Sequence, residues 1–268
     1  MTPEIPIEQF EIFATGLDHP ECIAFDREGM LWAGGEAGQV YRIAMDGRVE
    51  TVAELGGFCG GLAWTPDDAE LYVCNPAHGV VSVTREGKWK VFAKGMICPN
   101  YGVFHSDGTY YVSDSGNWQK ANGRVLRFDA GGGMETVLAP MGFANGLALD
   151  EDAGVLYVAE SDADRVVSVD LVTGVHRVYA ENTGRLPDGL ALDTEGNLYV
   201  SCYASDDIHR VDRSGSVTLF AYDRWAIKLS RPTNIAFHGG HLYAANFGRN
   251  TIARAPVGRT GRQLANQR

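Results

Sequence analysis

The sequence lacks the features that would place it in a membrane, in a disulfide scaffold or on nucleic acid. No apolar run in its 268 residues approaches the roughly 18–20 needed to span a bilayer. The five cysteines are scattered, odd in number and without a Cys-x-x-Cys pair, which favours a reducing compartment over a disulfide framework. An excess of 34 acidic over 23 basic residues, a net charge of −11, disfavours binding to nucleic acid or anionic membranes.

Two further signals are missing. The N-terminus, MTPEIPIEQF, has neither a basic n-region nor an apolar h-region, so no secretion signal is evident. A Gly-x-Ser-x-Gly elbow is absent, which disfavours a serine nucleophile. We therefore expect a cytoplasmic protein, a monomer or weak homo-oligomer, that acts on a small molecule.

The chain is rich in glycine, with 33 residues, and in turn-forming dipeptides between short apolar runs. One segment of this kind recurs six times at intervals of about 39 to 45 residues. The six copies are HPECIAFDREGMLWAGG (19–35), FCGGLAWTPDDAELYVCN (58–75), CPNYGVFHSDGTYYVSD (98–114), FANGLALDEDAGVLYVAE (143–160), LPDGLALDTEGNLYVS (186–201) and RPTNIAFHGGHLYAAN (231–246).

Each copy reads as two strands, and two more strand patterns follow it, such as VVSVDL from Val166 and HRVYA from His176. Four strands per repeat without helical periodicity are typical of a β-propeller blade. A parallel β-helix has a shorter period, and a two-sheet sandwich gives no reason for sixfold similarity.

The sixth copy lacks a fourth strand, and EQFEIFATG from Glu8 matches the outer-strand pattern. The sequence thus predicts an all-β fold, a six-bladed β-propeller of four-stranded antiparallel blades. The N-terminal strand would complete blade six and remove an exposed edge. We expect one domain over residues 1–258 and a disordered tail at 259–268.

In a propeller the first strand of each blade lines the central channel, so residues at one repeat position form a ring. Two carboxylates and two amides share such a position, and converging carboxylates repel each other unless a cation neutralises them. An all-oxygen ligand set favours one divalent ion, Ca²⁺ before Mg²⁺, Mn²⁺ or Zn²⁺. The alternative is that Asn or Asp before Gly only forms turns. The ring positions are Glu21, Gly60, Asn100, Asn145, Asp188 and Thr233, and the predicted metal ligands are Glu21, Asn100, Asn145 and Asp188.

Three motifs carry a resemblance to a known family: PE at residues 20–21, NGLALD at 145–150 and PDGLALDTEGNLYV at 187–200. With them, nearly the whole chain resembles the gluconolactonase, senescence-marker-protein and luciferin-regenerating-enzyme family of six-bladed propellers. Diisopropyl fluorophosphatase and the paraoxonases are similar more distantly, with a comparable Glu/Asn/Asn/Asp cation site.

The resemblance implies that Glu21, Asn145 and Asp188 bind one divalent cation and that Asn100 contacts the metal or the substrate. It also implies lactone hydrolysis as the activity, with phosphotriester hydrolysis in some members.

The chain departs from the sugar-lactone members of that family, which carry an Arg two residues before the Asn that corresponds to Asn100. Here the run is CPNY, and the other residues expected at the open face are mostly apolar. A less polar lactone or ester is therefore the favoured substrate. The alternative substrates are a sugar lactone, an aryl ester and a phosphotriester. The non-enzymatic alternative is a metal-stabilised propeller that binds another protein. The predicted substrate pocket comprises Phe58, Cys98, Tyr101, Asp114, Trp118, Phe143, Tyr203 and Phe247.

Hydrolysis at this ring would use a cation to polarise the carbonyl and water as nucleophile. Asp188 is the leading candidate for general base, with direct attack by Asp188 as a variant. His19, two residues before Glu21, is the alternative base, because an unperturbed imidazole pKa of about 6.5 suits proton transfer. Cys22 and Cys59 are interpreted as small residues that fill the channel wall.

Overall fold

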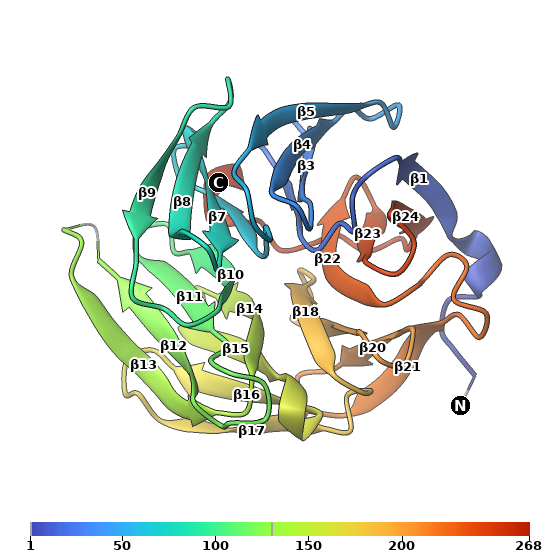
Figure 1. Ribbon diagram of the computed structural model, residues 1–268. Helices are drawn as coiled ribbons and strands as arrows, with labels where there is room; N and C mark the ends of the chain where they lie inside the picture. The colour runs from blue at the N-terminus through green and yellow to red at the C-terminus, as the bar shows by residue number, and fades with distance from the viewer. Residues whose placement is uncertain (1, 130) are drawn as a thin grey trace.

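The computed structural model describes residues 2–129 and 131–268. Six four-stranded antiparallel sheets surround a central channel (Figure 1), which confirms the predicted six-bladed propeller. The first, channel-lining strands of blades one to six are β2 (Ile23–Phe25), β6 (Leu62–Trp64), β10 (Pro99–Phe104), β14 (Ala144–Asp150), β18 (Pro187–Leu192) and β22 (Pro232–His238). The second strands are β3 (Leu31–Gly34), β7 (Glu70–Asn75), β11 (Tyr110–Asp114), β15 (Val155–Glu160), β19 (Leu198–Cys202) and β23 (His241–Asn246).

The outer half of each blade is built from two further strands. The third strands are β4 (Gln39–Ile43), β8 (Gly79–Thr84), β12 (Gly123–Phe128), β16 (Arg165–Asp170), β20 (Asp207–Val211) and β24 (Thr251–Pro256). The fourth strands are β5 (Val49–Glu54), β9 (Trp89–Ala93), β13 (Met134–Met141), β17 (His176–Glu181), β21 (Val217–Tyr222) and β1 (Glu11–Thr15). Three short 3₁₀ helices complete the described chain: η1 (Ile7–Gln9), η2 (Ser161–Ala163) and η3 (Ala265–Gln267). Among these residues no helix is long and apolar enough to cross a membrane.

The hydrophobic core lies between the blades, because each blade packs both faces of its inner strands against its neighbours. Trp32 of blade one and Trp64 of blade two meet edge to face, with ring centroids 5.1 Å apart. Tyr199 of blade five contacts Phe237 of blade six in the same way at 5.0 Å. Double-sided burial explains why inner strands read as nearly continuous apolar runs, whereas the outer strands keep an exposed face.

Blade six is closed by the N-terminal strand, as predicted. β1 pairs antiparallel with β24, with Glu11 opposite Arg254. Arg254 Nε lies 2.7 Å from Glu11 Oε1 across this pair. The pairing satisfies the backbone edge of β24 and joins the two ends of the repeat array.

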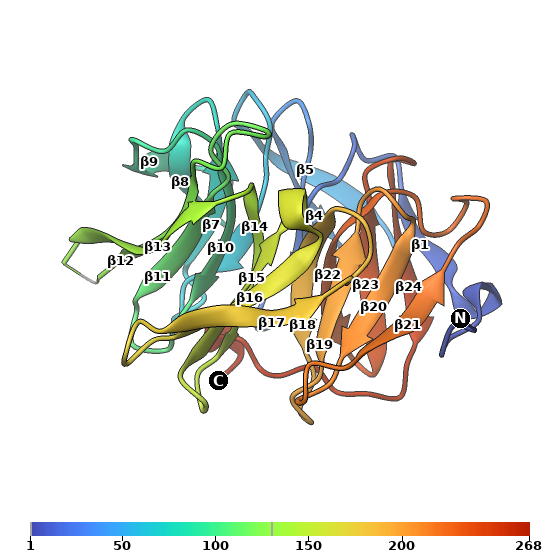
Figure 2. The ribbon, with the colours of Figure 1, turned by 90° about the horizontal axis from the view of Figure 1, so that it is seen from below.

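The tail at 259–268 is ordered, contrary to the expectation of disorder. Gly261 forms a β-bridge with Asp193, and the segment then crosses the lower end of the channel (Figure 2). Asn266, which is 2% exposed, donates from Nδ2 to the Phe25 carbonyl at 3.1 Å and to Asp68 Oδ1 at 2.9 Å. Ala265 packs into an apolar cavity formed by the ends of the first strands. The sequence of the tail is polar and has no periodic pattern, so its order could not be predicted. A few specific hydrogen bonds hold the tail in place.

Replacing Asn266 should therefore loosen the tail. We expect Asn266→Ala to lower the free energy of unfolding by about 1–3 kcal/mol, because Asp68 and the Phe25 carbonyl each lose a buried partner. Gln263→Ala, at an exposed position three residues earlier, should stay within about 0.5 kcal/mol of the parent protein. Chemical denaturation of both variants checks this, and equal stabilities would contradict the anchoring role.

Candidate functional site

The ring position is shaped by β-bulges rather than by turns. The pairing of first and second strands shifts register between Pro187 and Leu190 in blade five, and at the equivalent place in blades three, four and six. A bulge leaves its residues out of the regular ladder and re-aims their side chains. Asn145 and Asp188 thus lie within strands, so the interpretation of Asn-Gly and Asp-Gly as turn formers is wrong here.

In blades four and five the glycine after the ring residue permits close approach of neighbouring first strands. A Cβ on Gly189 would lie 2.5 Å from the Thr233 carbonyl oxygen and 2.7 Å from Asn234 Cα. Gly146 contacts the backbone of Asp188 in the same manner. These glycines narrow the channel and bring the ring residues of adjacent blades together.

Hydroxyl groups of blades four, five and six tie the ring strands to the next blade. Ser161 Oγ of blade four donates to the Pro187 carbonyl at 2.7 Å, and Ser201 Oγ of blade five donates to the Thr233 carbonyl at 2.7 Å. Thr233 Oγ1 of blade six then donates to the Glu21 carbonyl at 2.6 Å. Because these bonds run from blade to blade, they fix the relative heights of the ring residues.

Two carboxylates of the ring face the channel without a cationic partner. Neither Glu21 nor Asp188 forms an ion pair with any residue that the structure describes. Burial, with the charge of Glu36 adding to it, raises the pKa of Glu21 to about 8, although the Thr233 hydroxyl opposes the shift. Burial and then the charge of Glu21 raise the pKa of Asp188 well above its usual range. The pair is therefore a focus of unneutralised negative charge.

Asn145 adds a hydrogen-bond acceptor beside the carboxylates of Glu21 and Asp188. Its Nδ2 donates to Ser161 Oγ at 3.2 Å, while its buried Oδ1 has no hydrogen-bond partner in the described chain. The hydroxyl of Ser161 donates to the Pro187 carbonyl, so Ser161 Oγ must accept from Asn145, and this fixes the orientation of the amide. An orphaned buried oxygen is costly unless something outside the protein binds it.

The residues present fit a divalent cation. Glu21, Asn145 and Asp188 supply hard oxygen ligands, and Asn100 holds the equivalent position in blade three with its side chain 8% exposed. Gly60 has no side chain to offer, and the Thr233 hydroxyl is engaged by the Glu21 backbone. The predicted four residues are thus the ring members able to hold an ion.

The backbone is strained at the entrance to the ring. Four bulky residues, each two positions before a ring residue, adopt left-handed backbone conformations that side chains rarely occupy. Such conformations concentrate at functional sites, where the surrounding structure enforces them. They are His19 (φ 40°), Phe143 (φ 61°), Leu186 (φ 54°) and Arg231 (φ 46°).

His19, the alternative base, lies at the rim. Its Nδ1 is 2.9 Å from Asp18 Oδ1 and 3.0 Å from Glu36 Oε2, and its ring is 5.3 Å from that of Phe247. The two carboxylates fix the orientation of the imidazole through one nitrogen and leave Nε2 outside these contacts.

Five of the predicted pocket residues form two aromatic groups. Phe247 lies 6.4 Å from Phe58 and 6.1 Å from Tyr203 between ring centroids, and Trp118 meets Phe143 edge to face at 4.8 Å.

Two polar neighbours of the first group, Glu36 and Arg231, are not among the residues predicted from the sequence. Arg231 Nη1 donates to Tyr203 Oη at 3.1 Å, and both residues join His19 and Phe247 around one hollow. The signal for Arg231 is its repeat position: like His19 and Leu186, it directly precedes a proline and lies two residues before a ring residue, and it shares their left-handed backbone.

Three predicted pocket residues have other surroundings. Tyr101 lines the apolar cavity inside the channel and packs into the core between blades. Asp114 is fully buried and anchors the loop before Asn100: its Oδ1 accepts from the Cys98 amide at 2.8 Å, and its Oδ2 from Arg124 Nε at 3.0 Å. Cys98 is half-buried on that loop. Asp114 is therefore a structural anchor rather than a pocket residue.

The fold and the site define a six-bladed β-propeller with an oxygen-rich ring at one mouth of its channel. The chain belongs to the SMP-30/gluconolactonase/LRE-like family, whose profile matches residues 20–245. It is 25% identical over 236 residues to protein STRICTOSIDINE SYNTHASE-LIKE 10 of Arabidopsis thaliana, covering 71% of this chain and 62% of that protein. It is 27% identical over 129 residues to the pentonolactonase XacC of Haloferax volcanii, covering 46% of this chain and 43% of that protein.

The chain thus spans less than two thirds of the length of these relatives. Among solved structures, a calcium-binding regucalcin of Agrobacterium tumefaciens superposes with a TM-score of 0.78 at 19% identity, over 98% of each chain. At that identity the likeness concerns the fold alone.

The carboxylate pair should release protons when a cation binds. At pH 7, below the raised pKa of Glu21 of about 8, the metal-free pair is protonated in part, and ligation requires the charged forms. We expect calcium affinity to rise with pH up to about 8. Isothermal titration in buffers of different ionisation enthalpy measures the proton release, and a buffer-independent binding heat at pH 7 would contradict it.

Proposed function

We propose that this protein is a divalent-metal-dependent lactonase that opens a lactone less polar than a simple sugar lactone. The observation that carries the proposal is the ring itself: two unpaired, partly buried carboxylates beside an orphaned amide oxygen. Such a set is stabilised by a cation. Calcium is the preferred ion because every ligand is a hard oxygen.

The relatives support the activity class. One similar protein is named a pentonolactonase, and one structurally similar protein is described as a calcium-binding regucalcin. Their names concern those proteins, and the partial coverage makes activity and ion a proposal for this chain.

When bound, the cation would supply Lewis-acid polarisation of the lactone carbonyl. Asp188 would accept the proton of the attacking water, since a carboxylate that uses one oxygen as a ligand keeps the other for a hydrogen bond. Asn145 would stay oriented through Ser161, so that its oxygen faces the ring without reorganisation during the reaction. Trp118, Phe143 and Phe247 would bind the apolar part of the substrate and exclude water.

The substrate preference follows from the mouth. Cys98 stands where sugar-lactone members of the resembled family have an Arg, and its backbone amide is held by Asp114. The aromatic groups favour an alkyl or aryl substituent over a row of hydroxyl groups. Arg231 and His19 supply a polar side for the ester group.

Turnover of a lactone panel tests the proposal. We expect activity with Ca²⁺ on alkyl-substituted lactones above that on sugar lactones, aryl esters and phosphotriesters, loss of activity with EDTA and recovery on adding the ion back. Asp188→Asn should lower kcat by about 10²–10⁴-fold while the melting profile stays cooperative. Asp46→Asn changes an exposed carboxylate outside the site and should match the parent protein.

One outcome would contradict the proposed mechanism, and another would contradict the proposed activity. Full activity of Asp188→Asn would remove Asp188 as the base. Tight calcium binding without turnover of any substrate in the panel would instead favour a metal-stabilised, protein-binding propeller.

His19 and Asp188 can be separated as bases. We expect His19→Ala to reduce kcat/KM by about tenfold or less, because a rim imidazole tied to Asp18 and Glu36 orients substrate rather than accepts the reacting proton. The pH–rate profile should keep its shape. A loss of about 10²–10⁴-fold together with a displaced pH optimum would identify His19 as the base instead.

A further inference from the structure

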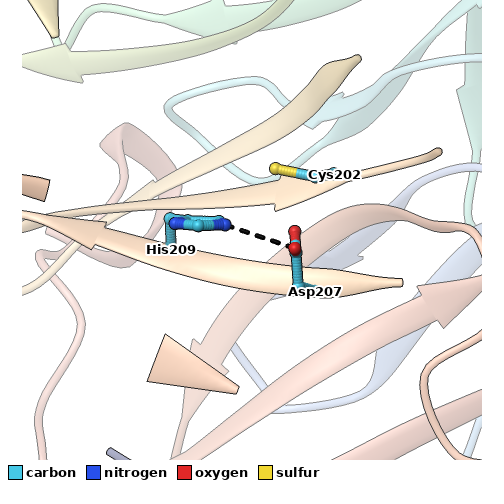
Figure 3. A group of neighbouring side chains, drawn as sticks. All are labelled: Cys202, Asp207 and His209. Atoms are coloured by element: carbon cyan, nitrogen blue, oxygen red, sulfur yellow. Dashed lines mark ion pairs between the residues drawn. The ribbon is translucent and has the colours of Figure 1, made fainter. Parts of the chain in front are cut away.

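Blade five contains a buried cluster of metal-ligating side chains away from the ring. Cys202, at the end of β19, pairs directly with Asp207, at the start of β20. His209 lies two residues further along β20, so its side chain projects from the same face of the sheet. The thiol sulfur, a carboxylate oxygen and a ring nitrogen all lie within 4.8 Å of one another (Figure 3).

The cluster departs from the pattern of the other blades. In blades two, three, four and six the residue aligned with Cys202 is an Asn, Asp or Glu that hydrogen-bonds the loop before the first strand. The residue aligned with His209 is a buried apolar one in those blades. The counterparts of Cys202 are Asn75, Asp114, Glu160 and Asn246, and those of His209 are Val81, Leu126, Val167 and Ala253.

The imidazole of His209 is buried, and its ring nitrogens form no hydrogen bonds in the part of the chain that the structure describes. His209 is 7% exposed, and neither of its ring nitrogens has a hydrogen-bond partner within residues 2–129 and 131–268. Nε2 lies 3.3 Å from Asp207 Oδ2, which is an ion pair when the imidazole is protonated and is the dashed contact in Figure 3. Replacing an apolar residue by an unsatisfied imidazole is costly unless a ligand binds the nitrogen.

The charges of the cluster match a divalent ion. A thiolate, a carboxylate and a neutral imidazole together carry two negative charges, so a bound divalent ion leaves a neutral site suited to burial. Sulfur, nitrogen and oxygen ligands in one set are typical of zinc, whereas the all-oxygen ring favours calcium. Without an ion, the Cys202 thiol donates to the Thr183 carbonyl at 2.8 Å, and this hydrogen bond is lost when the thiol gives up its proton to bind a metal.

The neighbouring loop packs closely against this position. Gly184 has a φ of +89°, and a Cβ there would collide with the Cys202 sulfur and lie 3.0 Å from Asp207 Oδ1. The loop between β17 and β18 therefore passes over the cluster only because this residue has no side chain.

We propose that Cys202, Asp207 and His209 form a second metal site, a structural zinc site that ties β19 to β20 where blade five packs against blade four. On binding, the Cys202 S–H bond is replaced by a sulfur–zinc bond and the proton passes to solvent. The alternative is a hydrogen-bonded chain alone, in which Ser205 Oγ donates to Asp207 Oδ1 at 2.8 Å and no ion is held.

Cobalt substitution tests the site, because Co²⁺ bound by a thiolate shows a sulfur-to-cobalt charge-transfer absorption that oxygen ligands do not give. We expect the full-length protein, unfolded in chelator and refolded with Co²⁺, to show this band, and Zn²⁺ to abolish it by competition. The band should persist in Asp188→Asn, which alters the ring. Its absence from the refolded parent protein would overturn the proposal whatever the variants do.

Three variants locate the ligands. Cys202→Ser should remove the band and lower the zinc content by about one ion per chain, and His209→Gln should weaken zinc binding at least tenfold. Cys74→Ser removes a buried thiol outside the cluster and should keep both the band and the zinc. Zinc retained in Cys202→Ser, or a band lost equally in Cys74→Ser, would show that the cluster is only a hydrogen-bonded chain.

Discussion

The repulsion between Glu21 and Asp188 is the interaction on which the rest of this molecule depends. Water cannot solvate both carboxylates fully in the channel, and no described Lys or Arg neutralises them. In the metal-free protein a proton relieves the cost, whereas a divalent cation relieves it more completely. The fold must supply enough stability elsewhere to hold these groups together.

That stability comes from the closure of the six blades into a ring. The β1–β24 pairing joins the two ends of the chain, and the hydroxyls of Ser161, Ser201 and Thr233 connect the ring strands from blade four round to blade one. Closure lets six weakly similar sheets bury both faces of their inner strands. It also prevents the carboxylates from separating, because moving one blade would break bonds to both of its neighbours.

Much of the fold and of the candidate site could be predicted from the sequence, because repeats can be counted along the chain. The spacing of the apolar triplets gives the number of blades, and the residue two positions before each triplet gives Glu21 and Asp188 as members of one ring. The order of the tail cannot be predicted from local sequence, because Asn266 acts through partners about 200 and 240 positions away. The sequence predicts Asp114 in the pocket, whereas its actual role depends on the loop that folds back onto it.

The sequence by itself determined the blade count, the ring and the family, because each depends on periodicity within one chain. Tertiary structure alone decided the direction of each polar atom: Asn145 Oδ1 is free only because Ser161 already donates to the next blade. It also decided that Cys202 and His209 meet, since their register across β19 and β20 cannot be deduced from spacing alone. Periodicity is carried along the chain, whereas hydrogen-bond satisfaction is settled only when distant segments pack together.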